Sequence, residues 1–166
     1  MCKNGDLVVY GAQGVCRITG DTTKVIGGKK LSYLVLEPLD QSGATCYIPS
    51  DNPNALAKLR PLLDKDTLER VLSSEEFRNA EWIEDENQRK QYYRELIACG
   101  DRVSIMLMIH RLHQHKQLQQ STGRKMHLCD ENFLRDAQKL LDPELSLAFG
   151  LKPEEVSAYV LSVLHK

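Results

Sequence analysis

Residues 59–72 read LRPLLDKDTLERVL, and within this stretch the chain changes its periodicity. The first four residues, LRPL, have the pattern of a short edge strand. Asp64 or Asp66 can then cap a short helix that runs through Leu72, because an aspartate side chain accepts hydrogen bonds from the free N–H groups of a first helical turn. The stretch therefore predicts a boundary near residue 62 between a part built of strands and a part built of helices.

The residues before this boundary have the short, alternating patterns of β-strands. The predicted strands are residues 7–10, 15–18, 22–26, 31–37 and 45–48, with a possible last edge strand at 59–62. Gly27-Gly28 predicts a hairpin, because glycine adopts positive φ freely. Gly20-Asp21 predicts a break, and residues 40–43 a turn. So many short strands within about 60 residues predict a small SH3/Tudor-like β-barrel.

The residues after the boundary have a helical period. Ser74 begins a turn, and longer helices are predicted over 80–98, from Asp101 to about 120, from 130–132 onward and from Pro153. The second of these four is apolar on nearly every side, so we expect it to be the buried central helix. Pro143 either interrupts the third or starts a new helix. The predicted fold is α+β, with a Tudor-like domain at 1–62 and an all-helical bundle at 63–166.

Composition places the chain among ordinary globular proteins. The 166 residues are 42% apolar and 27% charged. No apolar run reaches the length of a membrane span, and the first residues lack the apolar segment of a signal peptide, so we expect a cytoplasmic protein. The five cysteines show none of the paired spacing of a disulfide framework or a zinc site.

The net charge of −1 hides an uneven distribution. Residues 75–86 carry six acidic residues and one arginine, whereas residues 87–127 carry eight basic residues and two acidic ones. The basic segment is either an electrostatic surface for nucleic acid or a set of solvated helix faces.

Several motifs, in order along the chain, resemble the CarD/CdnL family of bacterial transcription regulators. They are GDLVVYGAQGV at 5–15, YLVL at 33–36, the pair Ile48-Pro49, LRPL at 59–62, Trp82 with Arg89, Tyr92, Leu96 and CGD at 99–101, and AQKLL at 137–141 with Glu144, Leu145 and Ala148. No single motif is specific to the family, but the motifs occur in the family's order and together extend over nearly the whole chain. The separation of Trp82 from the Arg-Tyr pair is about one helical turn longer than in several family members.

The resemblance implies that the barrel binds the β subunit of RNA polymerase. An open sheet edge can add a strand to a partner, so that main-chain hydrogen bonds supply affinity. The implied contact residues are Lys24, Tyr47 and Ile48. Tyr47 falls where the family often has an arginine, so its contact would be stacking; alternatively, it is only a surface residue of the barrel.

The resemblance also implies that the helical domain contacts promoter DNA at the upstream edge of the melted bubble and stabilises the open complex. Trp82, the only tryptophan, would wedge into the minor groove. Arg89, Lys90, Arg94, Arg124 and Lys125 would contact phosphates without reading sequence. Trp82 could instead pack in the core, and the basic residues could be merely solvated.

Two other classes of function compete with this interpretation. An enzyme could use a metal at His110 and His113, but no nearby carboxylate or thiolate pair completes a ligand set, so we expect neither an enzyme nor a cofactor nor a metal. A protein-interaction module could use the helices only as a scaffold, without DNA contact. Dependence on DNA distinguishes it from the transcription regulator.

Overall fold

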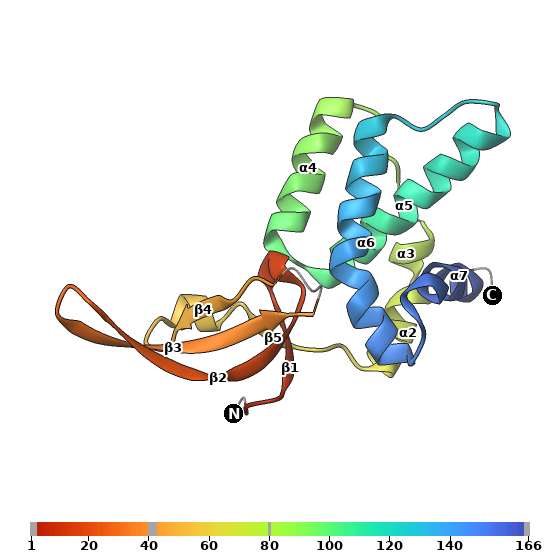
Figure 1. Cartoon of the computed structure of the whole chain (residues 1–166). Helices are drawn as coiled ribbons and strands as arrows, with labels where there is room; N and C mark the ends of the chain where they lie inside the picture. Colours follow the sequence, from red (N-terminus) through yellow and green to blue (C-terminus); the bar gives the residue numbers. More distant parts are fainter. Residues whose placement is uncertain (1–2, 40–42, 80, 165–166) are drawn as a thin grey trace. The chain divides into compact units, whose positions relative to one another are not determined.

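The computed structural model describes residues 3–39, 43–79 and 81–164. By its internal contacts the chain divides into two compact units, Met1–Leu62 and Leu63–Lys166 (Figure 1). The first unit contains all the strands that the structure describes, and the second contains only helices. The predicted α+β class, with a Tudor-like N-terminal domain and helices after it, is confirmed.

The N-terminal unit is a five-stranded antiparallel sheet in the order β4-β3-β2-β1-β5. Its elements are β1 (Leu7–Tyr10), β2 (Val15–Ile26), β3 (Lys29–Pro38), β4 (Cys46–Pro49), a one-turn helix α1 (Pro53–Leu56) and β5 (Leu59–Pro61). The alternating apolar residues meet on one face as a small core of Val8, Cys16, Ile18, Leu36 and Ile48. The strand order leaves β4 and β5 as the two edges of the sheet.

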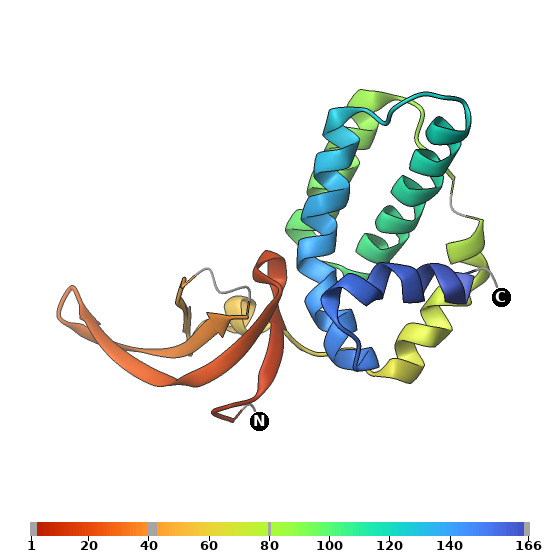
Figure 2. The same cartoon turned by 45° about the vertical axis from the view of Figure 1, so that its right-hand side comes forward.

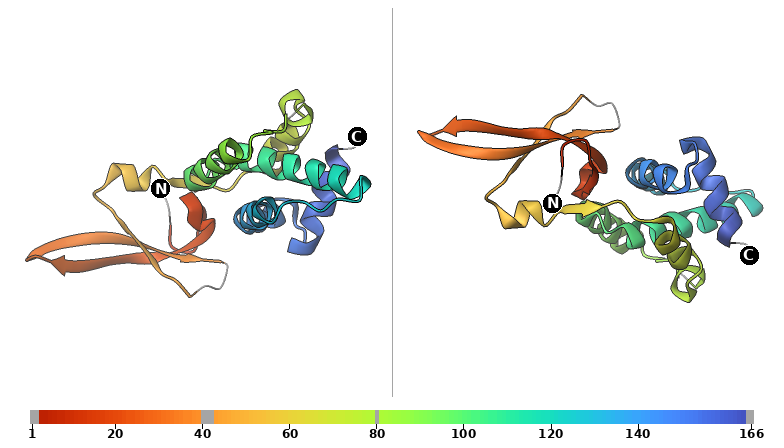
Figure 3. Two further views of the ribbon diagram at one scale, coloured as in Figure 1. Left: turned by 90° about the horizontal axis from the view of Figure 1, so that it is seen from above. Right: turned by 90° about the horizontal axis from the view of Figure 1, so that it is seen from below.

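The β2–β3 hairpin is longer than the sequence predicts. Gly20 and Asp21 do not end the strand: the register shifts between Ile18 and Gly20, and pairing continues to the Ile26–Lys29 pair. A bulge of this kind bends a strand without ending it. Gly27 and Gly28, with φ of 58° and 79°, close the hairpin as predicted. The hairpin extends beyond the short strands beside it (Figure 3).

The second unit is a bundle of helices around one shared core. Its elements are α2 (Lys65–Leu72), α3 (Glu75–Arg78), α4 (Glu86–Cys99), α5 (Arg102–Ser121), α6 (Leu128–Phe149) and α7 (Pro153–Leu164). α5 and α6 each contribute six buried residues, so α5 lies in the core as expected but shares it with α6. α4, α5 and α6 run side by side, and α7 crosses near one end, beside α2 (Figure 2). None of the described helices is long and apolar enough to cross a membrane.

Two helix predictions are corrected. The helix expected from residue 80 begins only at Glu86, because Asp85 caps it and accepts a hydrogen bond from the Gln88 N–H at 2.8 Å. Ala80 lies outside the described residues, as do residues 40–42 of the predicted turn. Pro143 neither interrupts α6 nor begins a new helix, since α6 continues through it.

Tertiary contacts explain why α6 tolerates its proline. The neighbouring Glu144 is buried, accepts a hydrogen bond from the Leu63 N–H at 2.7 Å and pairs with Arg102 at 2.6 Å. Leu141 and Leu145 pack in the core on the same side. These contacts offset the main-chain hydrogen bond that proline cannot donate.

Candidate functional site

Strand β4 presents main-chain groups at a free edge of the N-terminal sheet. It pairs with β3 through Leu34–Ile48 and Val35–Tyr47, and the Ser50 N–H donates to the Ser32 carbonyl at 2.9 Å. Hydrogen-bonded and non-hydrogen-bonded pairs alternate along an antiparallel ladder. Ser50 bonds to β3, as Ile48 then does, so the N–H and carbonyl of Tyr47 point away from the sheet. Tyr47 therefore offers the donor and acceptor that an added strand needs.

The Tyr47 ring lies against a lysine on the same face. Nζ of Lys24 is 3.4 Å from the centroid of the ring, and the Tyr33 ring meets it edge-on at 6.5 Å. Lys24 is exposed, and Tyr47 is 46% exposed. A cation–π contact at such an exposed position contributes only about 0.5–1 kcal/mol. The arrangement thus places an aromatic ring and a positive charge beside the free edge, where both are accessible to a partner.

In the helical unit, Trp82 lies in the extended segment before α4, half-buried against the core. Its ring stacks on the His115 ring with centroids 3.8 Å apart and planes 2° from parallel. Cζ of Arg89 lies 4.5 Å from the indole centroid. Burial lowers the pKa of His115, so the imidazole beside the indole is held toward its neutral form. A cleft of about 330 Å³ adjoins the indole, lined also by Glu84, Arg111, Gln114, His115, Leu118 and Gln119.

Arg89 is buried and fully engaged. Its Nε and Nη2 each donate to one carboxylate oxygen of Asp130 at 3.0 Å, and its Nη1 donates to the carbonyls of Ile83 at 2.7 Å and Glu84 at 3.2 Å. The side chains of Arg89 and Asp130 are 4% and 0% exposed. Burial acts to lower the pKa of Arg89, but the hydrogen bonds and charge of Asp130 raise it overall. The guanidinium joins α4, α6 and the segment that carries Trp82.

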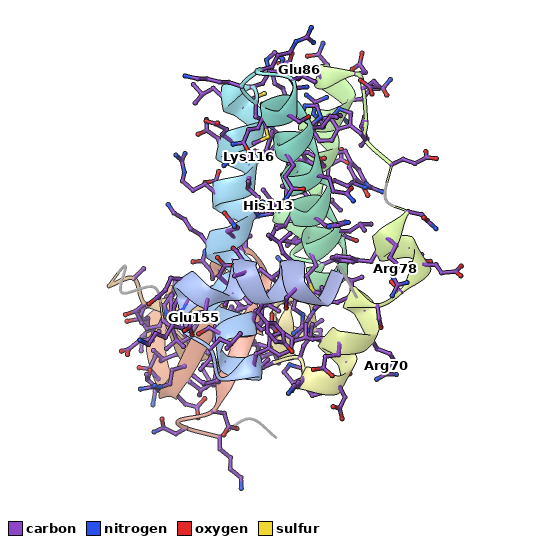
Figure 4. The ribbon with its side chains drawn as sticks, turned by 90° about the vertical axis from the view of Figure 1, so that its right-hand side faces the viewer. Arg70, Arg78, Glu86, His113, Lys116 and Glu155 are labelled. Atoms are coloured by element: carbon purple, nitrogen blue, oxygen red, sulfur yellow. The ribbon has the colours of Figure 1, made fainter. Side chains whose placement is uncertain are left out.

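The accessible basic residues among those expected to contact DNA lie on α4 and on the α5–α6 loop. Arg94, Arg124 and Lys125 are exposed, and Lys90 is partly exposed and forms an ion pair with Glu86. The hydrogen bond to Glu86 raises the pKa of Lys90, so the lysine remains charged. The start of α4, where Glu86 lies, is at the same end of the unit as the α5–α6 loop (Figure 4). Cys129 of α6 also approaches Glu86, with Sγ 3.8 Å from Oε1.

Residues 2–62 match the family model of the CarD-like/TRCF RID domain. The N-terminal unit is a CarD-like/TRCF RID domain. The motifs at the start of the chain therefore identified the family correctly. This is a transcription-related family of domains that interact with RNA polymerase. No curated protein matches the chain.

Within the RID domain, the structure separates the three residues expected to contact polymerase. Lys24 and Tyr47 lie together and are exposed. Ile48 is 1% exposed and packs in the core of the sheet. We correct its assignment: its side chain cannot reach a partner, and its role is to hold β4 in register. Side chains of successive strand residues point to opposite faces, so Tyr47 and Ile48 cannot both face outward.

Among the six residues expected to contact DNA, the assignment of Arg89 is corrected and the location of Trp82 is revised. Arg89 is buried against Asp130 and is not available to a phosphate. Trp82 is not on a helix with Arg89, because α4 begins after it. Lys90, Arg94, Arg124 and Lys125 remain accessible.

Sequence reasoning missed the partners of Trp82 and Arg89. These partners are Asp130, which lies in the predicted helix from 130–132 onward, and His115, which lies in the predicted helix from Asp101 to about 120. Neither has a local sequence signal, because each meets its partner across a distance of more than 30 residues. In the part of the chain that the structure describes, no three His, Cys, Asp or Glu side chains gather as a metal site.

Proposed function

We propose that this protein is a transcription regulator, not an enzyme, that binds the β subunit of RNA polymerase and stabilises the open promoter complex in the bacterial cytoplasm. The observation that carries the proposal is the RID domain at residues 2–62. The free edge of β4, with the outward main chain of Tyr47 and the Lys24–Tyr47 pair, supports docking by strand addition.

The helical unit would contact promoter DNA at the upstream edge of the bubble without reading its sequence. Accessible Lys90, Arg94, Arg124 and Lys125 are suited to phosphates. Trp82 would interact with an unstacked step, where the duplex is already opening and the cost of lost stacking is smallest. A ligand that binds the melted state more tightly than the closed state shifts the equilibrium toward melting.

A second function has an observation in its favour. A protein-interaction module with a helical scaffold would need no accessible DNA-binding tryptophan, and Trp82 is half-buried in a stack with His115. This alternative predicts that the helical unit contributes nothing that depends on salt.

Tyr47→Pro in the full chain should abolish binding to the polymerase β subunit. Proline removes the N–H that points away from β3, so the sheet keeps its internal hydrogen bonds while the partner strand loses a donor. Binding can be measured by surface plasmon resonance with the purified β subunit. Tyr47→Thr is the matched control, because it keeps the N–H and removes only the ring. A folded Tyr47→Pro variant that binds as tightly as the wild type would contradict docking through this edge.

Replacing Lys90, Arg94, Arg124 and Lys125 with Gln should weaken the polymerase–promoter complex equally on different promoters. Each lost phosphate contact should reduce the slope of log K against log salt by about 0.9. The measurement is complex stability over a range of salt concentrations. The control changes the same charge elsewhere on the helical unit, at Lys65, Arg70, Arg135 and Lys139. Equal slopes for the two quadruple variants would favour the scaffold alternative.

A further inference from the structure

We propose that the buried Arg89–Asp130 pair positions Trp82, holding the indole in its stack on His115 beside the cleft that it lines. The inference rests on the proposed function, in which Trp82 meets promoter DNA. In this proposal Arg89 and Asp130 themselves do not contact DNA. They act through the segment that carries the tryptophan.

The first step is the anchoring of that segment. Residues 81–85 have no regular secondary structure, so no helical or sheet ladder fixes them. Arg89 instead fixes the main chain of this segment, because its Nη1 donates hydrogen bonds to the consecutive carbonyls of Ile83 and Glu84. Asp130 fixes the guanidinium in turn through two parallel hydrogen bonds at 3.0 Å. A planar fork of five donors can make all these contacts at once.

The second step is the ring itself. The guanidinium carbon lies 4.5 Å from the indole centroid, and the His115 ring lies 3.8 Å away in a parallel plane. Trp82 is therefore in contact with side chains of both α4 and α5, which restrict its position. A side chain that is already ordered loses less conformational entropy on binding than a free one, so the arrangement would lower the cost of DNA contact.

The third step concerns why a charged pair occupies this position. Burying two charges is costly, and well-packed apolar residues of similar volume are often equally stabilising. The pair is thus poorly explained by stability alone. Its particular property is geometric: an apolar replacement could fill the space but could not hold two carbonyls.

The substitution Arg89→Lys tests the inference on the single-tryptophan protein. A lysine keeps the charge and can still pair with Asp130, but one ammonium cannot also reach both carbonyls and lie along the indole. We expect a red shift of Trp82 emission, a severalfold rise in the acrylamide quenching constant and loss of the near-UV circular dichroism of the indole. Arg102→Lys is the matched control, because it alters a second, largely buried arginine–carboxylate pair of this unit, Arg102–Glu144, and should leave all three signals unchanged.

Far-UV circular dichroism and unfolding midpoints of both variants separate positioning from stability. If Arg89→Lys does not fold, the double variant Arg89→Met with Asp130→Leu removes both charges together and should show the same changes in the Trp82 signals. A folded variant of either kind whose emission, quenching and near-UV signals equal those of the wild type would overturn the inference.

Open-complex lifetime distinguishes the positioning role from the proposed function. If Trp82 contacts DNA, Arg89→Lys should shorten the lifetime in the same direction as Trp82→Ala, whereas Arg102→Lys should not. Another outcome is that the Trp82 signals change in Arg89→Lys while neither Arg89→Lys nor Trp82→Ala alters the open-complex lifetime. That result would support the positioning role and contradict the proposed contact of Trp82 with DNA.

Discussion

Asp130→Ala should destabilise the helical unit by about 3–5 kcal/mol, because it leaves the Arg89 guanidinium buried without a counter-charge. The pKa of Arg89 lies above its already high ordinary value, so the side chain cannot escape this cost by losing its proton. For a domain of roughly 60–100 residues, each kcal/mol lowers the melting temperature by about 4–8 °C. The melting transition should therefore fall by well over ten degrees, as differential scanning calorimetry can measure.

The control for this prediction lies on the same helix. Asp136 is exposed and its nearest basic partner, Arg135, is 4.0 Å away, so Asp136→Ala should change the melting temperature little. Removing both partners of the buried pair, in Arg89→Met with Asp130→Leu, should recover much of the lost stability, since no unpaired charge then remains. Equal melting temperatures for Asp130→Ala and Asp136→Ala would show that the buried pair does not hold the helices together.

Asp142→Asn should stabilise the protein above about pH 6 and remove one pH-dependent contribution to its stability. Burial raises the pKa of the Asp142 carboxyl to about 6. The side chain lines a small apolar cavity of about 30 Å³ beside Phe77, Met106 and Leu145. Asparagine has nearly the same shape and carries no charge at any pH.

The direction of the pH effect follows from the proton balance. Between about pH 4 and 6 the unfolded chain has lost the Asp142 proton while the folded chain keeps it, so wild-type stability falls as pH rises through this range. The shift of about two pKa units corresponds to at most about 3 kcal/mol. Urea unfolding of wild type and Asp142→Asn from pH 4 to 8 measures it. The two curves should converge near pH 4, separate as the pH rises to about 6 and remain apart above it.

The exposed Asp136→Asn variant serves as the control for Asp142→Asn and should follow the wild-type curve throughout. Parallel curves for wild type and Asp142→Asn, with a constant difference from pH 4 to 8, would mean that the carboxyl does not titrate as described.

Local patterns predicted the type of most elements correctly, because the signals involved are local. Gly27-Gly28 closed a hairpin, and Asp64, Ser74 and Asp101 each capped the helix expected after them. The apolar run on α5 identified a helix that contributes to the core. Such signals depend on neighbours within a turn or a ladder, and the sequence contains those neighbours in full.

Errors arose where one local signal was outweighed by another or by contacts with distant residues. The sequence of residues 80–85 is compatible with a helix. The side chain of Asp85, however, accepts a hydrogen bond from the Gln88 N–H, so α4 begins directly after it. Pro143 carries a strong breaking signal, yet Glu144 is fixed by Arg102 and by the Leu63 N–H, and the helix continues. In both places, whether the helix forms depends on small differences in free energy that the periodicity of the sequence does not reveal.

The sequence by itself determined the RID family, the order of strands before helices and the group of charges that could face a partner. Only the tertiary structure decided which of those charges are accessible: Arg89 is buried against Asp130, whereas Arg94, Arg124 and Lys125 are exposed. It likewise placed Trp82 on His115 and turned Ile48 into the core beneath Tyr47. The physical reason is that burial and ion pairing are set by residues distant in the chain, and a basic residue in a local pattern looks the same whether its counter-ion is a phosphate or an aspartate 41 positions away.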